Sequence, residues 1–406
     1  MAKADLVTPH VLIISPNYPP EQGACASRIR YMAQGLAKAG YRVEVLTAMP
    51  NYPKGKVFDT YRNKLFFRRL DENVLVKHYP IYPSHSASIL PRLLGMFSLA
   101  FSVLFHVFSA KKSKPTLVIA QSPPLLLALS AYWLSVVYKA EFVLNISDLW
   151  PRALLDLGAI KKGFIYGLVS KLEVFLYRKA KLCIGQSEEI LSHIQAQAPA
   201  QPTFLYRTGV DCDFFQVITP QEIGNRPFKI VYAGLLGIAQ GILSICKKLN
   251  FKELNAEMHI YGDGYERKLL ATYLAKHPHL GIYLHDSVAY EQMPSVLLQY
   301  DAMLVTQKNI VYGTVPSKIY EAMSVGLPIL FCGGGEGANI ILENGVGLVS
   351  PPSNFDLLKE NILEMTQMPL EEKKILGAKG RQFALSKLDR KMLIIRLIEQ
   401  LAKVGL

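Results

Sequence analysis

Residues 313–330 read GTVPSKIYEAMSVGLPIL, and this stretch contains the unit from which the fold is built. Pro316 and Ser317 suit the start of a helix, because proline has no backbone N–H to leave unsatisfied in a first helical turn. The helix runs into the apolar segment PILFCGG, which begins at Pro328 and is typical of a buried strand. A helix followed by a buried strand is what a parallel α/β sheet requires between successive strands.

The same alternation of short apolar runs and helical stretches occupies nearly the whole chain, in two blocks. In the first block the strand-like runs are HVLIISP, YRVEVLTAM, TLVIAQS, EFVLNIS and KLCIGQS, starting at residues 10, 41, 116, 141 and 181. In the second block they are FKIVYAG, MHIYGDG, IYLHDS, AMLVTQ, PILFCGG and VGLVSPP, starting at residues 228, 258, 282, 302, 328 and 346. The pattern predicts an α/β protein with two doubly wound, Rossmann-like domains.

The seam between the two blocks lies near residues 213–227, where polar residues, Pro220 and Gly224 interrupt the apolar rhythm. Doubly wound sheets bind their ligands outside the carboxyl ends of the strands, so we expect the two domains to face each other across a cleft that holds the reactants. The predicted domains are an N-terminal domain over 1–215, a C-terminal domain over 216–385, and a helix over 386–406 that returns to the N-terminal domain.

The composition is that of a globular chain. The 406 residues are 50% hydrophobic, and 28 glycines and 24 prolines are close to ordinary usage, which excludes fibrous and disordered classes. The five cysteines are scattered without metal-ligand spacing, so we expect a reducing compartment and no structural metal. The polar start, residues 1–10, lacks the apolar core of a secretory signal, and we predict a cytoplasmic protein.

The positive charge is concentrated in the first half of the chain. Residues 1–215 carry 25 Lys+Arg against 14 Asp+Glu, whereas residues 216–406 carry 20 against 18. Such a field favours an anionic partner, either nucleic acid or an acidic membrane surface. Nucleic-acid binding is disfavoured, because no recognised module interleaves basic and aromatic residues.

One apolar segment fits the membrane alternative. Residues 93–110 form a run of 18 without Asp, Glu, Lys or Arg, flanked by Arg92 and by lysines from Lys111 onward. As one helix the run would be about 27 Å long, just short of the ~30 Å hydrocarbon core, so no spanning helix is predicted. A monotopic membrane contact and an ordinary buried helix are equally compatible with this run. His106 is the only potentially charged residue of residues 93–110. The later run LLLALSAYWLSVVY, from Leu125, is interpreted as a core helix.

The loop after the first strand carries less information. It reads PPEQGACASR from Pro19 to Arg28 and lacks the three glycines of a dinucleotide-binding turn, which disfavours a nicotinamide oxidoreductase. Ser27 is a possible N-cap, and Arg28 in the first helical turn would let an anion or a sugar approach. A plain tight turn is equally compatible with this loop.

The helix that starts near Ser317 is the clearest candidate for a diphosphate site. Its first N–H groups and the positive end of its dipole lie beside Lys318, which can neutralise and donate to phosphate. Glu321, one turn further on, is placed to accept hydrogen bonds from a ribose diol. The alternative is that Lys318 and Glu321 form an exposed helical ion pair of little consequence.

At this point the sequence resembles glycosyltransferase family 4. The segment VPSKIYEAMSVGLPIL is similar to the donor-binding helix of that family, and Glu321 matches the second glutamate of its E-x7-E motif. The resemblance is closest to the bacterial O-antigen and capsule subgroup that transfers 2-acetamido sugars such as N-acetyl-L-fucosamine. Further matching segments are PPEQGACASR, LTAMPNYPKGK, DLWP from Asp148, TGVD from Thr208, YAGLLGIAQG from Tyr232, YGDG from Tyr261 and ENGVGLVSPP from Glu343.

The resemblance implies a GT-B fold and a retaining, metal-independent transfer from a nucleotide sugar, usually a UDP-sugar, without any cofactor. It implies a polyprenyl-diphosphate-linked or saccharide acceptor and a place on the inner face of the cytoplasmic membrane. Asp148 and Lys318 are the predicted catalytic residues, Asp148 as partner of the acceptor hydroxyl or, alternatively, as a turn-capping residue. The predicted donor-binding residues are Gly23, Arg28, Gly234, Gly237, Gln240, Gly262, Gly264, Thr314, Ser317, Lys318 and Glu321.

The sequence also departs from the family pattern. Gly313 occupies the position of the first glutamate of E-x7-E, and Leu235 and Gln240 stand where many members have Arg and Lys. These changes leave Lys318 and the helix start to carry more of the phosphate contacts. Asp211-Cys212-Asp213 matches the DxD pattern that binds a metal in other glycosyltransferase folds. It follows Thr208 in the interdomain loop, and we predict that it does not bind a metal. The alternative functions are a nucleotide-sugar epimerase of the related two-domain fold and a non-catalytic sugar- or lipid-binding protein.

Overall fold

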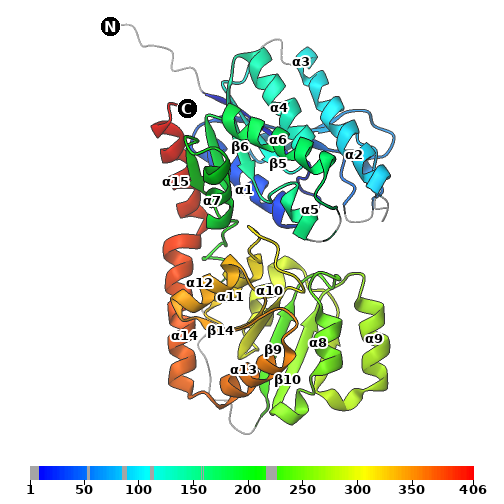
Figure 1. The fold of residues 1–406 in the computed structure, drawn as a ribbon, viewed down its shortest axis with the longest axis vertical. Coiled ribbons are helices and arrows are strands. Elements are labelled where there is room, and N and C mark those ends of the chain that lie inside the picture. The colour runs from blue at the N-terminus through cyan, green and yellow to red at the C-terminus, as the bar shows by residue number, and fades with distance from the viewer. Residues whose placement is uncertain are drawn as a thin grey trace. The chain divides into compact units, whose positions relative to one another are not determined.

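The computed structural model describes residues 9–52, 55–84, 89–109, 114–156, 158, 160–215 and 226–406. The chain divides into two compact units. The first comprises residues up to Thr208 together with Leu393–Leu406, and the second comprises Gly209–Met392. Figure 1 shows the helices and strands of each unit.

The first unit is built on an eight-stranded sheet. Its strands are β1 (His10–Ile14), β2 (Arg42–Ala48), β3 (Phe67–Asp71), β4 (Val74–Tyr79), β5 (Leu117–Ser122), β6 (Glu141–Ile146), β7 (Leu182–Gly185) and β8 (Thr203–Leu205). Its helices are α1 (Ala24–Lys38), α2 (Ile89–Ser102), α3 (His106–Ser109), α4 (Leu125–Tyr138), α5 (Arg152–Asp156), α6 (Phe164–Lys179) and α7 (Glu188–Gln197). The last helix of the chain, α15 (Arg390–Lys403), contributes all but its first residues to this unit.

The strand order is β3-β4-β2-β1-β5-β6-β7-β8, and every pair is parallel except β3 with β4. In register, Leu12 of β1 lies between Glu44 of β2 and Val118 of β5. All five residues of β1 are buried, which is why the central strand is almost uniformly apolar. The chain order reverses between β1 and β5, so the switch point of this sheet lies at their carboxyl ends.

The second unit repeats the design with six parallel strands. The strands are β9 (Phe228–Ala233), β10 (Ala256–Tyr261), β11 (Ile282–His285), β12 (Ala302–Thr306), β13 (Ile329–Cys332) and β14 (Gly347–Ser350). The helices are α8 (Ile242–Lys248), α9 (Arg267–Lys276), α10 (Met293–Leu297), α11 (Ser317–Val325), α12 (Glu336–Asn344), α13 (Phe355–Gln367) and α14 (Leu370–Phe383), and the last continues into a π-helical turn, Ala384–Leu388.

The order β11-β10-β9-β12-β13-β14 is the doubly wound order 3-2-1-4-5-6, with its switch point between β9 and β12. Alternate residues of β9 enter two separate cores, because successive side chains of a strand point to opposite faces. Val231 belongs to the core that contains α11, and Ile230 to the core that contains α8 and α13. Both faces of the sheet are therefore covered, as a parallel sheet requires.

The prediction of two Rossmann-like domains is confirmed, and each of the eleven predicted strand runs coincides with or overlaps a strand. The pattern missed β3, β4 and β8. Strand β3 has the sequence FRRLD and forms the antiparallel edge of its sheet, where alternate side chains are exposed and no apolar run is needed. Strand β8 has only three residues, all half-buried.

The chain leaves the second unit at Met392 and ends on the first. Leu393, Leu397 and Leu401 of α15 repeat at helical spacing and are buried in the core that contains α1 and the strands β1 and β7. Gly35 of α1 faces Ile394 so closely that a Cβ on this glycine would come within 2.4 Å of the isoleucine side chain. The missing side chain lets the two helices pack.

The apolar run from Leu93 is not one helix. Helix α2 ends at Ser102, a 3-10 turn covers Val103–Phe105, and α3 follows from His106, while Ala110 lies outside the described residues. The break coincides with two polar side chains that point into the protein. The Ser102 hydroxyl donates to the Pro80 carbonyl at 2.8 Å, and the His106 ring bonds Glu44 at 2.8 Å. The structure therefore corrects the expectation of a single 27 Å helix.

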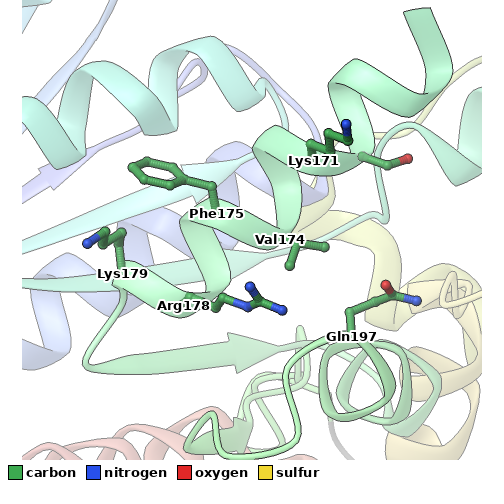
Figure 2. Close-up of a pocket in the computed structure, with 7 residues that line it drawn as sticks. Lys171, Val174, Phe175, Arg178, Lys179 and Gln197 are labelled. Atoms are coloured by element: carbon green, nitrogen blue, oxygen red, sulfur yellow. The ribbon is translucent and has the colours of Figure 1, made fainter. Parts of the chain in front are cut away.

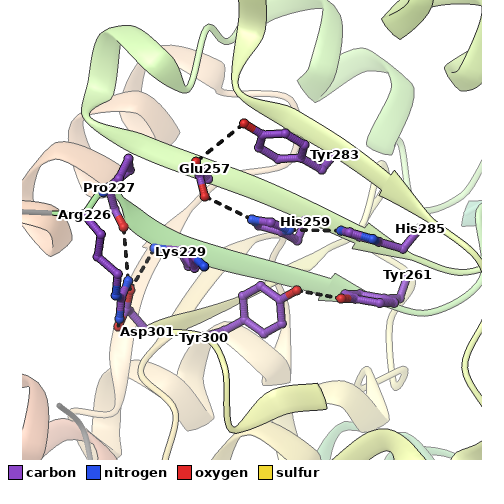
Figure 3. A network of polar contacts seen from close by, with 10 residues as sticks. All are labelled: Arg226, Pro227, Lys229, Glu257, His259, Tyr261, Tyr283, His285, Tyr300 and Asp301. Carbon is purple, nitrogen blue, oxygen red and sulfur yellow. Dashed lines mark hydrogen bonds and ion pairs between the residues drawn. The ribbon is translucent and has the colours of Figure 1, made fainter. Parts of the chain in front are cut away.

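A polar and aromatic layer covers the β10–β11 edge of the second sheet (Figure 3). The His259 and His285 rings are stacked, with Nδ1 of His259 2.9 Å from Nε2 of His285. Glu257 lies 3.3 Å from the other nitrogen of His259. Burial lowers the pKa of both histidines, although Glu257 opposes the shift at His259.

We expect this pair to make the second unit acid-sensitive. Because their pKa values are lowered by burial, both imidazoles bind protons less readily in the folded protein than in the unfolded chain, so the free energy of unfolding should fall as the pH drops below about 6.5. Urea unfolding at pH 7.5 and 5.5 should show a loss of about 1–2 kcal/mol that the variant His259→Asn/His285→Asn lacks. An equal loss in the wild type and the variant would contradict this account.

Candidate active site

The helix start predicted from the sequence is present in the second unit. Helix α11 begins at Ser317 with Pro316 as its N-cap residue, and Pro316 offers no side chain to cap the first-turn N–H groups. The helix follows the loop after β12, one of the two strands that define the switch point. The positive end of a nine-residue helix therefore lies where doubly wound sheets bind their ligands.

Lys318 and Glu321 are joined by an ion pair of 2.8 Å between Nζ and Oε2. The lysine side chain keeps 30% of its surface exposed, whereas the glutamate side chain keeps 12%. The pair is therefore half-buried rather than fully exposed, which separates it from the surface pairs that contribute little. Glu321 holds the Lys318 ammonium group close to the start of the helix, the predicted position of a diphosphate.

The loop after β9 lies against this lysine. A Cβ on Gly234 would stand 3.8 Å from Cε of Lys318, so the missing side chain keeps the space beside the lysine open. The Gly234 N–H donates to the Tyr261 carbonyl at 2.9 Å, which fixes the loop to the end of β10. Gly234 and Lys318 are thus brought together at the carboxyl end of β9, and their contact with a donor stays a prediction.

Gly262 and Gly264 have a packing role in this loop arrangement. Both have positive φ, 156° and 149°. A Cβ on Gly262 would lie 1.9 Å from the Gly234 carbonyl oxygen, and one on Gly264 would lie 2.6 Å from that of Leu236. Only glycine allows this close approach of two backbones. Direct contacts from these two glycines to a donor stay a prediction.

Gly237 and Gln240 complete the same loop. A Cβ on Gly237 would come within 2.7 Å of the Gln240 Oε1, an atom that is buried and has no hydrogen-bond partner among the described residues. The Thr306 hydroxyl at the end of β12 donates to the Gln240 carbonyl. Thr314 lies in the turn before α11, where its N–H donates to the Val311 carbonyl at 3.1 Å.

The predicted residues of the first unit lie near its own switch point, and the sequence misplaced one boundary there. Helix α1 begins at Ala24, and Gly23 is its N-cap with φ 137°. Ser27 is therefore not the N-cap but a helical residue whose N–H donates to the Gly23 carbonyl at 3.1 Å. The helix starts after Gly23 because a positive φ is not helical but is readily adopted by glycine, so Gly23 is the last non-helical residue of the loop.

Arg28 is 2% exposed and bonds side-chain amides from two strand ends. Its guanidinium donates to Oε1 of Gln121 at 2.9 Å and to Oε1 of Gln186. Asn145 also donates to the Gln121 oxygen, at 2.8 Å. Arg28 therefore holds together the carboxyl ends of β5, β6 and β7, and a direct contact with the donor stays a prediction.

Sequence reasoning missed this amide network. Gln121, Asn145 and Gln186 each interrupt or follow an apolar strand run, in TLVIAQS, EFVLNIS and KLCIGQS. Polar residues near the carboxyl ends of three neighbouring strands could have predicted the network, because those ends meet at one edge of a parallel sheet.

Asp148 follows β6 at the same edge. The Ser147 hydroxyl lies 3.2 Å from its Oδ2, and the same hydroxyl accepts from Gln121 at 2.9 Å. Burial raises the pKa of the nearby Cys25 thiol, Arg28 lowers it and the Asp148 carboxylate raises it further. Asp148 is therefore connected to the amide network and lies beside the first turn of α1.

Two further features of the structure bear on the site. Within the described ranges, no three side chains of the His, Cys, Asp and Glu types gather as ligands of a metal ion would. A pocket of about 550 Å³ lies elsewhere in the first unit, between α6 and α7, and none of the predicted site residues lines it.

Comparison with protein families gives the class of this enzyme. Residues 23–205 match the model of a glycosyl transferase 4-like domain, and residues 218–383 match that of glycosyl transferases group 1. The chain is therefore a glycosyltransferase with one Rossmann-like domain of each kind.

Two bacterial glycosyltransferases are similar to this chain in sequence. The chain is 25% identical to the putative colanic acid biosynthesis glycosyl transferase WcaI of Escherichia coli, over 78% of this chain and 81% of that protein. It is 28% identical to the probable glycosyltransferase WbjE of Pseudomonas aeruginosa, over 71% and 75%. Neither name supports the epimerase alternative.

Solved structures establish the GT-B fold. The sucrose-phosphate synthase of Thermosynechococcus elongatus aligns with a TM-score of 0.74 at 13% identity, over 98% of this chain and 99% of that chain. The Anabaena protein HepE in complex with UDP and glucose aligns with a TM-score of 0.68 at 16% identity, over 97% and 99%. At these identities the likeness concerns the fold alone.

Proposed function

We propose that this enzyme moves a sugar from a UDP-sugar to a lipid-linked or saccharide acceptor during bacterial surface polysaccharide synthesis. The observation that carries the donor part is the Lys318–Glu321 pair at the uncapped start of α11, beside Gly234 at the switch point. The names of WcaI and WbjE and the UDP bound to HepE support the sugar-transfer setting. A retaining course, a 2-acetamido donor such as N-acetyl-L-fucosamine and independence of metal follow from the family resemblance.

The chemistry fits these groups. Breaking the bond between the sugar and UDP leaves negative charge on the departing diphosphate, which must be stabilised in the transition state. Fixed N–H dipoles at a helix start and an ammonium group supply that stabilisation without reorganising. The Glu321 carboxylate can accept hydrogen bonds from the ribose hydroxyls while it holds Lys318 in place.

The proposal is tested by product analysis. The purified enzyme is incubated with a panel of UDP-2-acetamido sugars and a polyprenyl-diphosphate sugar, and the products are identified by mass spectrometry. Transfer from one of these donors supports the proposal, and turnover of no UDP-sugar would contradict it. A parallel reaction without acceptor that yields an epimerised sugar would instead favour the epimerase.

We expect Glu321→Ala to weaken UDP binding by about tenfold. The substitution removes the acceptor for the ribose diol and leaves Lys318 without its 2.8 Å partner, and hydrogen bonds to charged groups contribute about 1.5–3 kcal/mol each. Calorimetry with UDP measures the change, and Glu360→Ala on the exposed face of α13 is the control. UDP affinity equal to that of the wild type would contradict the ribose role.

The membrane part of the proposal is supported by the reversed polarity of α2 and α3. Most of their described large apolar side chains are exposed, whereas the buried residues include Leu99 and Ala100 together with the polar Ser102 and His106. The exposed side chains, with their exposed fractions, are Leu93 (38%), Leu94 (47%), Phe97 (55%), Phe101 (63%), Phe105 (45%) and Phe108 (71%). A helix in water normally shows the opposite arrangement, and an exposed apolar row of this size marks a contact surface.

A buried network holds this inverted segment in place. His106 bonds Glu44 and, through its other ring nitrogen, the Tyr138 hydroxyl at 2.9 Å. Lys77 adds an ion pair of 2.6 Å to Glu44. Burial would raise the pKa of Glu44, but His106 and Lys77 outweigh it and lower the pKa to about 2. The His106 ring therefore points into the protein, and the phenylalanines of the segment lie on its exposed face.

In the part of the chain that the structure describes, no helix has the length and apolar character needed to cross a bilayer. We propose that the exposed row lies in the interface of an anionic membrane, on its cytoplasmic side, as a monotopic contact does.

In liposome flotation we expect binding that requires anionic lipid and falls with salt. Phe97→Ser/Phe101→Ser should lower the partition coefficient at least tenfold, because burying each phenylalanine fully is worth about 1.5–3 kcal/mol. Leu342→Ser/Ile375→Ser, two exposed apolar residues of the second unit, is the matched control. Flotation unaffected by lipid charge, salt and the phenylalanine changes would contradict the membrane proposal.

A further inference from the structure

The pocket between α6 and α7 gathers positive charge. It is lined by Ser170, Lys171, Val174, Phe175, Arg178, Lys179 and Gln197. Figure 2 shows that all but Gln197 come from α6, and that the side chains of Arg178 and Gln197 extend toward each other. Three cations at one pocket repel each other, so an anion is the ligand that would relieve them.

These cations have no carboxylate to neutralise them. Among the described side chains, neither Lys171 nor Arg178 forms an ion pair, and Lys179 makes only a distant contact, 5.8 Å from Nζ to the Phe175 ring centroid. The one acidic residue of α6, Glu173, is buried, does not line the pocket and is bonded to other partners. It accepts from the Tyr177 hydroxyl at 2.7 Å and lies 3.5 Å from His193.

The walls of the pocket are partly apolar, and so is the start of the same helix. Val174 and Phe175 line the pocket, and the Phe175 ring packs edge-on against Tyr132 of α4 at 5.6 Å. Upstream on α6, Phe164 is 88% exposed and Ile165 is 73% exposed. Helix α4 packs between α2 and α6, so α6 extends the layer whose outer side carries the apolar row of α2.

We propose that this pocket binds the headgroup phosphate of an anionic glycerophospholipid. The cations and the Gln197 amide would bind the phosphate oxygens, and the apolar wall would contact the glycerol and the first methylenes of the chains. A pocket of about 550 Å³ has room for a whole headgroup rather than a phosphate ion alone. This inference rests on the membrane part of the proposed function and adds a specific lipid site to it.

The first test uses dihexanoyl phosphatidylglycerol below its micelle concentration as the probe, with binding to the full chain followed by calorimetry. We expect saturable binding that Lys171→Gln/Arg178→Gln weakens about 30-fold, since each basic residue near a lipid phosphate is worth about fivefold in affinity. The control Lys268→Gln/Lys276→Gln removes the same charge from exposed positions of α9 and should bind as the wild type does. Equal binding by the pocket variant would overturn the proposal.

The second test separates the possible sources of phosphate. Inorganic phosphate and glycerol 3-phosphate should bind far more weakly than the short-chain lipid, because they lack the methylenes that contact Val174 and Phe175. Binding of inorganic phosphate as tight as that of the lipid would show a small-anion site and overturn the lipid assignment.

UDP affinity and sugar transfer in detergent should be unchanged in the pocket variant. Failure of the lipid site is therefore distinguishable from failure of the nucleotide proposal, and flotation of the phenylalanine variant reports on the membrane surface independently.

Discussion

Replacing Lys318 by alanine is expected to lower kcat for sugar transfer by about 10²- to 10³-fold, the usual cost of removing one preorganised donor. The expected loss is large because two cations of the family pattern are replaced in this chain. Leu235 and Gln240 stand where the family often has Arg and Lys, so the proposal leaves the ammonium group and the α11 N–H groups to stabilise the diphosphate charge. The substitution should leave the fold intact, since 30% of the lysine side chain is exposed and its ion pair is the only polar interaction it loses among the described residues.

Single-turnover kinetics with saturating donor measures this step without interference from product release. Lys318→Arg retains the charge and should recover part of the rate, whereas Lys359→Ala on the exposed face of α13 should behave as the wild type does. Sugar transfer by Lys318→Ala at a kcat near that of the wild type would refute the central role of the α11 start.

The fold could be predicted from the sequence because burial on both faces leaves a strong pattern. Most strands of the two sheet interiors are nearly continuous apolar runs, and all of the interior strands except β4 were located. The missed strands have sequence patterns that differ from a continuous apolar run. In β3, Arg68 and Leu70 are exposed while Asp71 is buried, where it bonds Arg30 and Tyr18. Nothing local in the sequence shows that this aspartate has a partner 41 residues away.

The candidate site was predictable to the extent that it depends on local geometry. The helix start at Ser317 follows from Pro316, and the proximity of Lys318 to Glu321 follows from helical spacing. Arg28 was interpreted as an anion contact because the helix start was placed too late, near Ser27 instead of at Ala24, and the burial of the side chain was not known. Its amide partners lie 93 and 158 residues further along the chain, and only the packing of the strands brings them together.

The same limit applies to the apolar run from Leu93. Sequence alone left a buried helix and a membrane contact equally open, because both require an apolar run. The decision depends on which side of the helix faces the sheet. His106 fixes the orientation of the segment through its bond to Glu44, 62 residues earlier, and phenylalanines lie on the exposed side, while a membrane contact stays a proposal.

Asp148→Asn is expected to reduce sugar transfer by about 10²- to 10⁴-fold, the range typical of a lost general acid or base, while UDP affinity changes less than twofold. The two effects should separate because Asp148 lies in the first unit and the predicted diphosphate contacts at α11 lie in the second. Asparagine is nearly isosteric and can still accept from Ser147, so a purely structural aspartate would tolerate it. Ser147→Ala is the complementary variant, since it removes that hydrogen bond and keeps the carboxylate. If Asp148 only stabilises the turn after β6, Ser147→Ala should be the more damaging change and Asp148→Asn should transfer sugar almost normally, which would remove Asp148 from the catalytic residues.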